Sequence, residues 1–263
     1  MSIQIAIANP KGGTAKTSTA VNLASALAIT GRRVLIVDLD AQGSATVALD
    51  IKRLSPSPLL EALSVGRPLH KEEPVTYARG RFDLLPSGED LTALPVMAHR
   101  EGEESVVLAP VFQELSSLYD LILLDCPPSM GCVTDSALRF ADYLIIPTHC
   151  EMLSLAAVET LLNRVAKLRA EGLSRVAVLG ILRTMHDPEA LSETFEDACQ
   201  HLKDDGPLVF DTVIPYSSRV SEASALGKPV IYYDRSSLGA RAYLTFAGEF
   251  IAALEGAAAK ASD

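Results

Sequence analysis

Seven short apolar runs recur along the chain, and most of them are hydrophobic at every position rather than at alternate positions. They are residues 3–8, 33–39, 82–87, 120–125, 142–148, 176–184 and 209–215. Strands with continuous hydrophobicity are typically buried on both faces. Between the runs, residues 16–30, 153–172 and 237–256 carry apolar side chains every three or four positions, which is the period of an amphipathic helix. The alternation predicts an α/β fold with one doubly wound, mostly parallel sheet and helices on both of its faces.

The chain carries no internal repeat and no low-complexity linker that would divide it. We therefore expect one domain, residues 1–256, followed by a frayed tail, residues 257–263. A chain of 263 residues is long enough for one large domain with a substantial core, whereas two domains would each be small. The less regular stretch 50–80 is interpreted as a surface excursion with a short helix near 58–64.

The overall composition indicates a globular chain, with 48% hydrophobic and 21% charged residues. A net charge of −10 disfavours DNA or an anionic membrane as a partner through bulk attraction, so such binding would need a local basic patch. The four cysteines form no C-x-x-C pair, which argues against a disulfide framework and a zinc site. Because neither a signal peptide nor an apolar stretch of ~20 residues is present, we expect a cytoplasmic protein without a membrane partner.

The stretch ANPKGGTAKTS, residues 8–18, joins the first expected strand to the first expected helix. Ligands of open parallel sheets bind at loops of this kind. Backbone N–H groups of residues 12–16 can surround phosphate oxygens, Lys16 can reach the β- and γ-phosphates, and the Thr17 hydroxyl can ligate Mg²⁺. Pro10 and Ala15 occupy the glycine positions of the pattern G-x-x-x-x-G-K-[ST]. From the loop alone, the alternative is a glycine-rich turn that caps a helix.

Two later strands also end in carboxylates. The stretch VDLDAQGSAT, residues 37–46, carries Asp38 and Asp40. In YDLILLDCPPS, Asp125 follows four apolar residues, which is the layout of a Walker B carboxylate that holds Mg²⁺, usually through water. An isolated aspartate at a strand end is more often a helix cap or a solvated carboxylate. Three matched sites in the right chain order favour a magnesium–nucleotide site instead.

These motifs resemble those of the deviant-Walker-A ATPases of the ParA/MinD superfamily, and within it the ParA (Soj-like) partition ATPases. The family loop K-G-G-x-G-K-[ST]-[ST] is matched by KGGTAKTS except at Ala15. Residues 37–46 and 119–131 are similar to the second and third family motifs, and residues 212–243 resemble the C-terminal ParA signature. The resemblance spans nearly the whole chain and implies a P-loop ATPase with ATP and Mg²⁺ as cofactors.

The resemblance also implies roles for single residues. Lys11 matches the signature lysine that crosses an ATP-bound homodimer to contact the phosphates of the partner subunit, and Asp40 matches the residue that positions or activates the attacking water. Lys11, Lys16 and Asp40 are therefore the candidate catalytic residues. The candidate metal residues are Thr17, Asp38, Asp40 and Asp125. Nucleotide contacts are expected from Lys11, Gly12, Gly13, Thr14, Ala15, Lys16, Thr17 and Ser18, and adenine contacts from Thr184, Met185, Pro215, Tyr216 and Ser217.

Ala15 is the departure from the family loop. If the family glycine has a positive φ or lies close to phosphate, alanine strains or crowds the loop. Because a methyl group is small and the N–H donor is kept, we expect nucleotide binding to persist, with turnover the property most open to change.

ParA-type dimers bind nonspecific DNA, and a ParB-like or cargo adaptor protein stimulates hydrolysis, so the resemblance implies both partners and a nucleoid-associated location. The candidate DNA contacts are Arg219, Lys228, Arg235 and Arg241, which with Glu222 and Asp234 give residues 215–245 a net charge of +2. Two departures weaken this expectation: residues 186–193 contain no lysine or arginine, and Tyr216 replaces a common arginine. A second basic group, Arg164, Lys167, Arg169 and Arg175, is interpreted as a solvated helix face.

The sequence matches other classes of P-loop protein less well. A MinD-like role on a membrane surface needs a basic amphipathic C-terminal helix, whereas FIAALEGAAAKASD offers one lysine and many alanines. The nitrogenase iron-protein branch needs two cysteines in a separated pattern, which Cys126 and Cys132 do not provide. An ATP-dependent dimerising regulatory adaptor that hardly hydrolyses ATP stays open as the alternative, since Ala15 leaves room for slow turnover. The cargo of a partition ATPase (a plasmid, a chromosome or a protein body) is not identified by the sequence.

Overall fold

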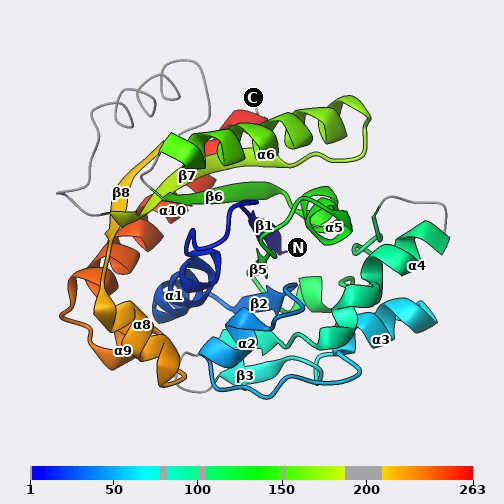
Figure 1. Cartoon of the computed structure of the whole chain (residues 1–263), viewed down its shortest axis with the longest axis horizontal. Coiled ribbons are helices and arrows are strands. Elements are labelled where there is room, and N and C mark those ends of the chain that lie inside the picture. The colour runs from blue at the N-terminus through cyan, green and yellow to red at the C-terminus, as the bar shows by residue number, and fades with distance from the viewer. Residues whose placement is uncertain (1, 78–81, 101–104, 150–151, 187–208, 263) are drawn as a thin grey trace.

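A twisted sheet runs through the middle of the computed structural model, which describes residues 2–77, 82–100, 105–149, 152–186 and 209–262 (Figure 1). Within these residues eight strands pair in the order β3-β4-β2-β5-β1-β6-β7-β8. Their bounds are β1 Ile3–Ile7, β2 Val34–Asp38, β3 Val75–Tyr77, β4 Phe82–Leu85, β5 Leu121–Asp125, β6 Tyr143–His149, β7 Ala177–His186 and β8 Val209–Pro215. Every neighbouring pair is parallel except β3–β4. The predicted mostly parallel α/β sheet is confirmed.

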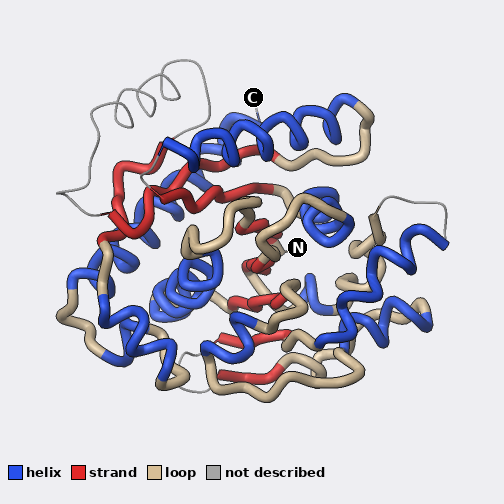
Figure 2. The backbone as a smooth tube through the Cα atoms, in the orientation of Figure 1, coloured by secondary structure: helices blue, strands red, loops and turns tan. Residues whose placement is uncertain are grey.

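Helices cover both faces of this sheet, and Figure 2 shows the strands as a curved row between two groups of helices. The bounds are α1 Lys16–Ile29, α2 Ser44–Ala48, α3 Pro58–Val65, α4 Leu94–Arg100, α5 Cys132–Phe140, α6 Met152–Ala170, α8 Ser218–Ala225, α9 Val230–Tyr233 and α10 Leu238–Ser262, with short 3₁₀ turns η1 Glu89–Ala93 and η2 Leu115–Ser117. The helices expected at 16–30, 58–64, 153–172 and 237–256 correspond to α1, α3, α6 and α10. Helix α10 also includes residues 257–262 of the expected tail.

Two hydrophobic cores explain why the strands are apolar at every position. In β5, Ile122 and Leu124 pack on one face with residues of α3, α4, α5 and α6. The alternate residues Leu121 and Leu123 pack on the other face with residues of α1 and α10. Because successive strand side chains point to opposite faces, a strand covered on both sides must be hydrophobic throughout. No described helix is both long enough and apolar enough to cross a bilayer.

Local sequence signals set the ends of α3, the helix within the irregular stretch 50–80. The Ser57 hydroxyl accepts a hydrogen bond from the Leu60 N–H group at 3.4 Å, and Pro58 occupies the first helical turn. Gly66 ends the helix with a φ of +66°, the left-handed conformation that glycine adopts without strain. β3 was not predicted because it has only three residues, at the edge of the sheet.

The strand order brings the three sequence motifs together. β5 lies between β1 and β2, so that Asp125 is in register with Ile7 on one side and Asp38 on the other. Parallel strands end at the same edge of a sheet, and the loops that follow β1, β2 and β5 therefore meet there. This edge carries the candidate site.

Candidate nucleotide-binding site

The loop between β1 and α1 is fixed to the neighbouring strands by side-chain hydrogen bonds. Asn9 donates from Nδ2 to the Pro147 carbonyl at 2.8 Å and accepts from the Lys11 N–H group at 2.9 Å. The buried Thr184 hydroxyl donates to the carbonyl of Thr14, 3.1 Å away, or to that of Thr148 at the same distance. The hydroxyl of Thr184, a predicted adenine contact, thus links the loop backbone to the end of β6. Asn9 was not predicted.

Lys16 is the first residue of α1 and its side chain is almost fully enclosed, with 7% of the residue exposed. Its ammonium donates to the Lys11 carbonyl at 3.1 Å, across the loop. Burial lowers the pKa of Lys16, and the neighbouring Asp125 and Asp40 oppose that shift. A cation held in such surroundings is stabilised further when an anion binds next to it.

The carboxylates of β2 and β5 form a buried acidic pair behind the loop. Asp125 accepts a hydrogen bond from the Thr17 hydroxyl at 2.8 Å, and its other oxygen, Oδ1, has no hydrogen-bond partner among the described residues. Asp38 accepts from the N–H group and the hydroxyl of Thr46 at 2.8 and 2.6 Å. Burial, and then the charge of Asp38, raises the pKa of Asp125. Burial likewise raises the pKa of Asp38, to about 6.

A cavity of about 810 Å³ opens over the loop. Its floor is residues 12–18, and Asp40 and Gln42 line one side. The helices α2 and α8 also line the cavity: Val47 and Ala48 come from α2, and Val220, Ser221, Ser224 and Ala225 come from α8. The volume is within the range of small-molecule and cofactor sites. Lys16, Thr17 and Asp40 thus share one cavity, as predicted from their motifs, whereas the serines of α8 were not predicted.

A second cavity of about 250 Å³ adjoins the first, since Gly13, Ala15, Ser18, Val220 and Ser221 line both. It is also lined by Met185, Ile214, Pro215, Tyr216, Ser217 and Tyr243. Four of the five predicted adenine contacts are in this set. Tyr243 was missed because it occupies a core position of the apolar helical pattern in α10, where it is fully buried.

Comparison with known proteins shows the family of the chain. A family model described as an AAA domain matches residues 2–178. The chain is 34% identical over 262 residues to the chromosome partitioning protein ParA of Caulobacter vibrioides, covering 98% of this chain and 97% of that one. The chain belongs to the ParA/MinD superfamily of P-loop ATPases, close to ParA.

Two further proteins are similar to this chain over most of its length. The sporulation initiation inhibitor protein Soj of Bacillus subtilis is 34% identical over 250 residues, covering 94% of this chain and 98% of that one. The structure of cobyrinic acid a,c-diamide synthase from Mycobacterium smegmatis, with bound ATP analogue and magnesium, has a TM-score of 0.79 and 29% identity, covering 94% of this chain and 93% of that one. Proteins of the ParA/MinD superfamily include partition and positioning ATPases, which is the functional class of this chain.

The ParA loop of this chain contains a strained alanine. Ala15 has φ +60° and ψ +30°, in the left-handed region, and Gly13 two residues earlier has φ +74°. For a residue with a Cβ atom this conformation is unfavourable by roughly 1–2 kcal/mol. Ala15, where the chain departs from the family loop, therefore has the positive φ that strains an alanine.

Replacing Ala15 by glycine is expected to stabilise the protein by about 0.5–1 kcal/mol, because relief of the left-handed strain exceeds the larger backbone entropy that glycine loses on folding. Thermal unfolding measures the change, which corresponds to roughly 1–4 °C for a chain of this size. The matched control is Ala156→Gly at an exposed position within α6, which is expected to destabilise by about 1 kcal/mol. Equal destabilisation by both substitutions would contradict the strain.

The candidate DNA contacts all lie on α8, α9, α10 or their connections, but in different surroundings. Arg219 is exposed and its guanidinium forms ion pairs with Glu222 at 2.7 Å and Asp234 at 3.6 Å. Lys228 is half-buried and lines a small cavity together with Thr17 and Ser18. Arg235 and Arg241 are exposed.

Arg164, from the second basic group, is not a solvated helix residue. Its guanidinium donates to both carboxylate oxygens of Asp135, at 2.9 and 2.5 Å, in a largely buried ion pair. Residues 187–193, where the sequence lacks lysine and arginine, lie outside the described residues.

Proposed function

We propose that this ParA-family chain is an ATP-driven switch: its ATP-bound homodimer binds nonspecific DNA and partitions or positions a cargo, and hydrolysis stimulated by a partner protein resets it. ATP and Mg²⁺ are its cofactors. The observation that most supports the proposal is the convergence of Lys16, Thr17 and Asp40 on one large cavity at the carboxyl edge of the sheet. Asp125 lies directly behind Thr17.

The residues of the site fit a magnesium ion held mainly by its nucleotide. Asp125 presents a buried carboxylate oxygen without a partner among the described residues, next to the hydroxyl of Thr17. Within the same residues no group of three or more histidine, cysteine or acidic side chains could hold a metal ion. Thr17 would therefore be the direct protein ligand, with Asp125, Asp38 and Asp40 around the ion. When bound, Mg²⁺ offsets the negative charge of the phosphates.

Other residues of the site bind the phosphates and orient the attacking water. The N–H groups of residues 12–16 and the start of α1 bind phosphate oxygens, and Lys16 places its positive charge beside them. Asp40 lines the cavity and orients the attacking water. Intrinsic turnover is slow, because a switch of this kind requires a long-lived ATP state.

Lys11, unlike Lys16, lies outside the lining of the nucleotide cavity. It is half-buried and is not among the residues that line the cavity of its own subunit, although it belongs to the same loop. This position supports a role in which its ammonium reaches the nucleotide of the second subunit. A cation there stabilises charge that develops during phosphoryl transfer, as an arginine finger does.

Lys11→Ala is expected to keep its affinity for ATP within about threefold, because the groups that bind phosphate within one subunit are unchanged, and to lose both ATP-dependent dimerisation and stimulated turnover. Light scattering with ATP and with ADP measures the dimer, and phosphate release measures turnover. Lys71→Ala removes an exposed lysine of the α3–β3 connection and serves as the control. Normal stimulated turnover by Lys11→Ala would refute the cross-subunit role.

The DNA-binding part of the proposal rests on the basic side chains of α8–α10 in a segment of net charge +2. Since Arg219 is paired with acidic neighbours and Lys228 is half-buried, few free charges face solvent and binding should be weak and sensitive to salt. The partner is a ParB-like or cargo adaptor protein, the location is cytoplasmic and nucleoid-associated, and the cargo is a plasmid, a chromosome or a protein body.

A second candidate is a dimerising regulatory adaptor that binds ATP but hardly hydrolyses it. The strained Ala15 in the phosphate loop is the observation that favours it. Turnover measured with and without DNA and partner separates the two, since the adaptor is not stimulated by either. A MinD-like role on a membrane is disfavoured by the alanine-rich end of α10, which lacks bulky apolar and basic side chains together.

A further inference from the structure

We propose that Arg53 is a positioning residue for the ATPase reaction, which acts by holding the turn that carries Asp40. This inference rests on the proposed role of Asp40. The turn, residues 39–43, leads from β2 into α2 and forms one side of the nucleotide cavity. Arg53 does not line that cavity, so any effect it has on the reaction is transmitted through the turn.

The guanidinium of Arg53 packs directly against the backbone of the turn. Its Nη2 donates a hydrogen bond to the Ala41 carbonyl at 2.5 Å. Gly43 has φ +68°, and a Cβ atom placed there would come within 2.8 Å of Arg53 Nε. The side chain thus fills the space beside Gly43, while it bonds to the residue that follows Asp40.

Ser87 holds the same turn from the end of β4. Its buried hydroxyl donates to the Asp40 carbonyl at 2.5 Å, and its N–H group donates to the Thr46 hydroxyl at 3.0 Å. Thr46 in turn donates to Asp38. The carbonyls of two consecutive residues, Asp40 and Ala41, are therefore each fixed by a side chain distant in sequence.

The Asp40 carboxylate needs this support because the hydrogen bond that it makes within the described part of the chain is a local one. It accepts a hydrogen bond from the Gln42 N–H group at 2.9 Å, within the turn itself. The position of the carboxylate in the cavity therefore follows the position of the turn. Displacement of a catalytic group by about 1 Å can lower a rate about 100-fold.

Stability through an ion pair is not the main role of Arg53. Its charged partner is Glu89, at 3.3 Å, and the Glu89 side chain is 86% exposed. Exposed pairs of this kind contribute little to folding. The hydrogen bond to the Ala41 carbonyl is the contact by which Arg53 differs from an ordinary surface arginine.

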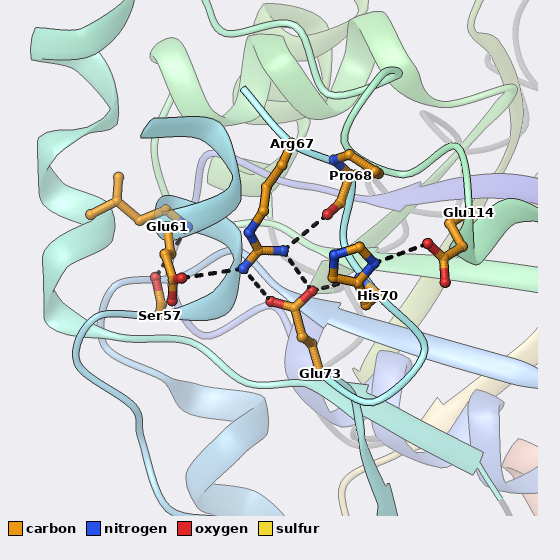
Figure 3. Close-up of polar contacts among 8 residues, drawn as sticks. Ser57, Glu61, Arg67, Pro68, His70, Glu73 and Glu114 are labelled. Atoms are coloured by element: carbon orange, nitrogen blue, oxygen red, sulfur yellow. Dashed lines mark hydrogen bonds and ion pairs between the residues drawn. The ribbon is translucent and has the colours of Figure 1, made fainter. Parts of the chain in front are cut away.

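The test compares Arg53→Gln and Arg53→Lys with a matched control, Arg67→Gln. Arg67 and Arg53 have equally exposed side chains, 28% and 29%. Arg67 follows α3 and donates to Glu61, Glu73 and the Pro68 carbonyl, while His70 nearby contacts Glu114, as Figure 3 shows. None of these residues lines the nucleotide cavity.

Arg53→Gln is expected to lower kcat about tenfold and to leave KM for ATP within about twofold, because the phosphate loop is unchanged. Arg53→Lys, which keeps a cationic donor, is expected to recover kcat to within about threefold of the wild type. Arg67→Gln leaves kcat within about twofold of the wild type, since it removes only a remote ion-pair network. Amide hydrogen exchange of residues 39–45 is expected to be faster in Arg53→Gln and unchanged in Arg67→Gln.

The inference is overturned if Arg53→Gln lowers kcat no more than Arg67→Gln does, or if exchange of residues 39–45 is unchanged. Asp40→Ala, assayed alongside, separates this outcome from failure of the proposed function. If Asp40→Ala is slow while Arg53→Gln is normal, only the role of Arg53 fails. If Asp40→Ala turns over ATP at the wild-type rate, the role of Asp40 fails, and that of Arg53 fails with it.

Discussion

Lys16→Ala is expected to weaken the binding of ATP by at least about 30-fold. The ammonium is held next to the phosphate loop at the start of α1, where 7% of the residue is exposed. Losing one partner of a buried, charge-assisted contact weakens binding by roughly 2–5 kcal/mol, and every 1.4 kcal/mol is about tenfold in affinity. Titration calorimetry or a fluorescent ATP analogue measures the change.

Thermal unfolding without nucleotide distinguishes this loss from misfolding. Burial lowers the pKa of Lys16, which means that burying the charged ammonium costs free energy in the protein without nucleotide. The unfolding temperature of Lys16→Ala should therefore stay close to that of the wild type. Lys52→Ala, which removes an exposed lysine after α2, should change neither property. If Lys16→Ala bound ATP with unchanged affinity, the phosphate-loop assignment would be wrong.

Asp40→Ala is expected to lower turnover by roughly 100- to 10,000-fold, the usual contribution of a positioned acid–base group, while ATP still binds. The phosphate-binding groups of the loop are untouched, so the protein accumulates as an ATP dimer. Phosphate release measures the rate, and size-exclusion chromatography with ATP measures the dimer. Glu61→Ala, which removes a carboxylate of α3 outside the cavity, should change neither quantity.

Asp40→Asn adds a sharper comparison. The amide oxygen can still accept the hydrogen bond from the Gln42 N–H group, so the turn is kept while the charge is removed. Turnover as slow as that of Asp40→Ala would assign the effect to the carboxylate rather than to the turn. A mutant at this position that stays monomeric with ATP would contradict the trapped-dimer expectation.

The sheet and its principal helices were predictable because their signals are local and strong. Ile122 and Leu124 on one face and Leu121 and Leu123 on the other make β5 apolar throughout, and the other central strands have the same pattern. β3 and the helices α2, α4, α5, α8 and α9 were not predicted. These elements have three to nine residues, which gives at most about two and a half helical turns in which a period could show.

The parts of the site that the sequence predicted are those on recognisable loops. Lys16, Thr17, Asp38, Asp40 and Asp125 meet because β1, β5 and β2 are neighbours in the sheet. The contacts of the Thr184 hydroxyl with the main-chain carbonyls of Thr14 and Thr148 could not be predicted, because both partners are distant in the sequence.

The supporting residues could not be found from the sequence. Ser87 lies 47 residues from its partner Asp40, and Arg53 lies 12 residues from its partner Ala41. No rule of sequence spacing connects either residue with the turn. Tyr243 lines the second cavity from a helix whose period predicts only burial. Contacts of this kind depend on how strands and loops are placed in space, and they became visible only in the structure.

DNA binding by Asp40→Ala, measured with ATP, with ADP and without nucleotide at two salt concentrations, tests the switch most directly. The proposed function predicts binding with ATP alone, and it predicts that added salt weakens this binding because the contacts neutralise phosphates. Absence of binding in every nucleotide state, while ATP still drives dimerisation, would contradict the role on DNA.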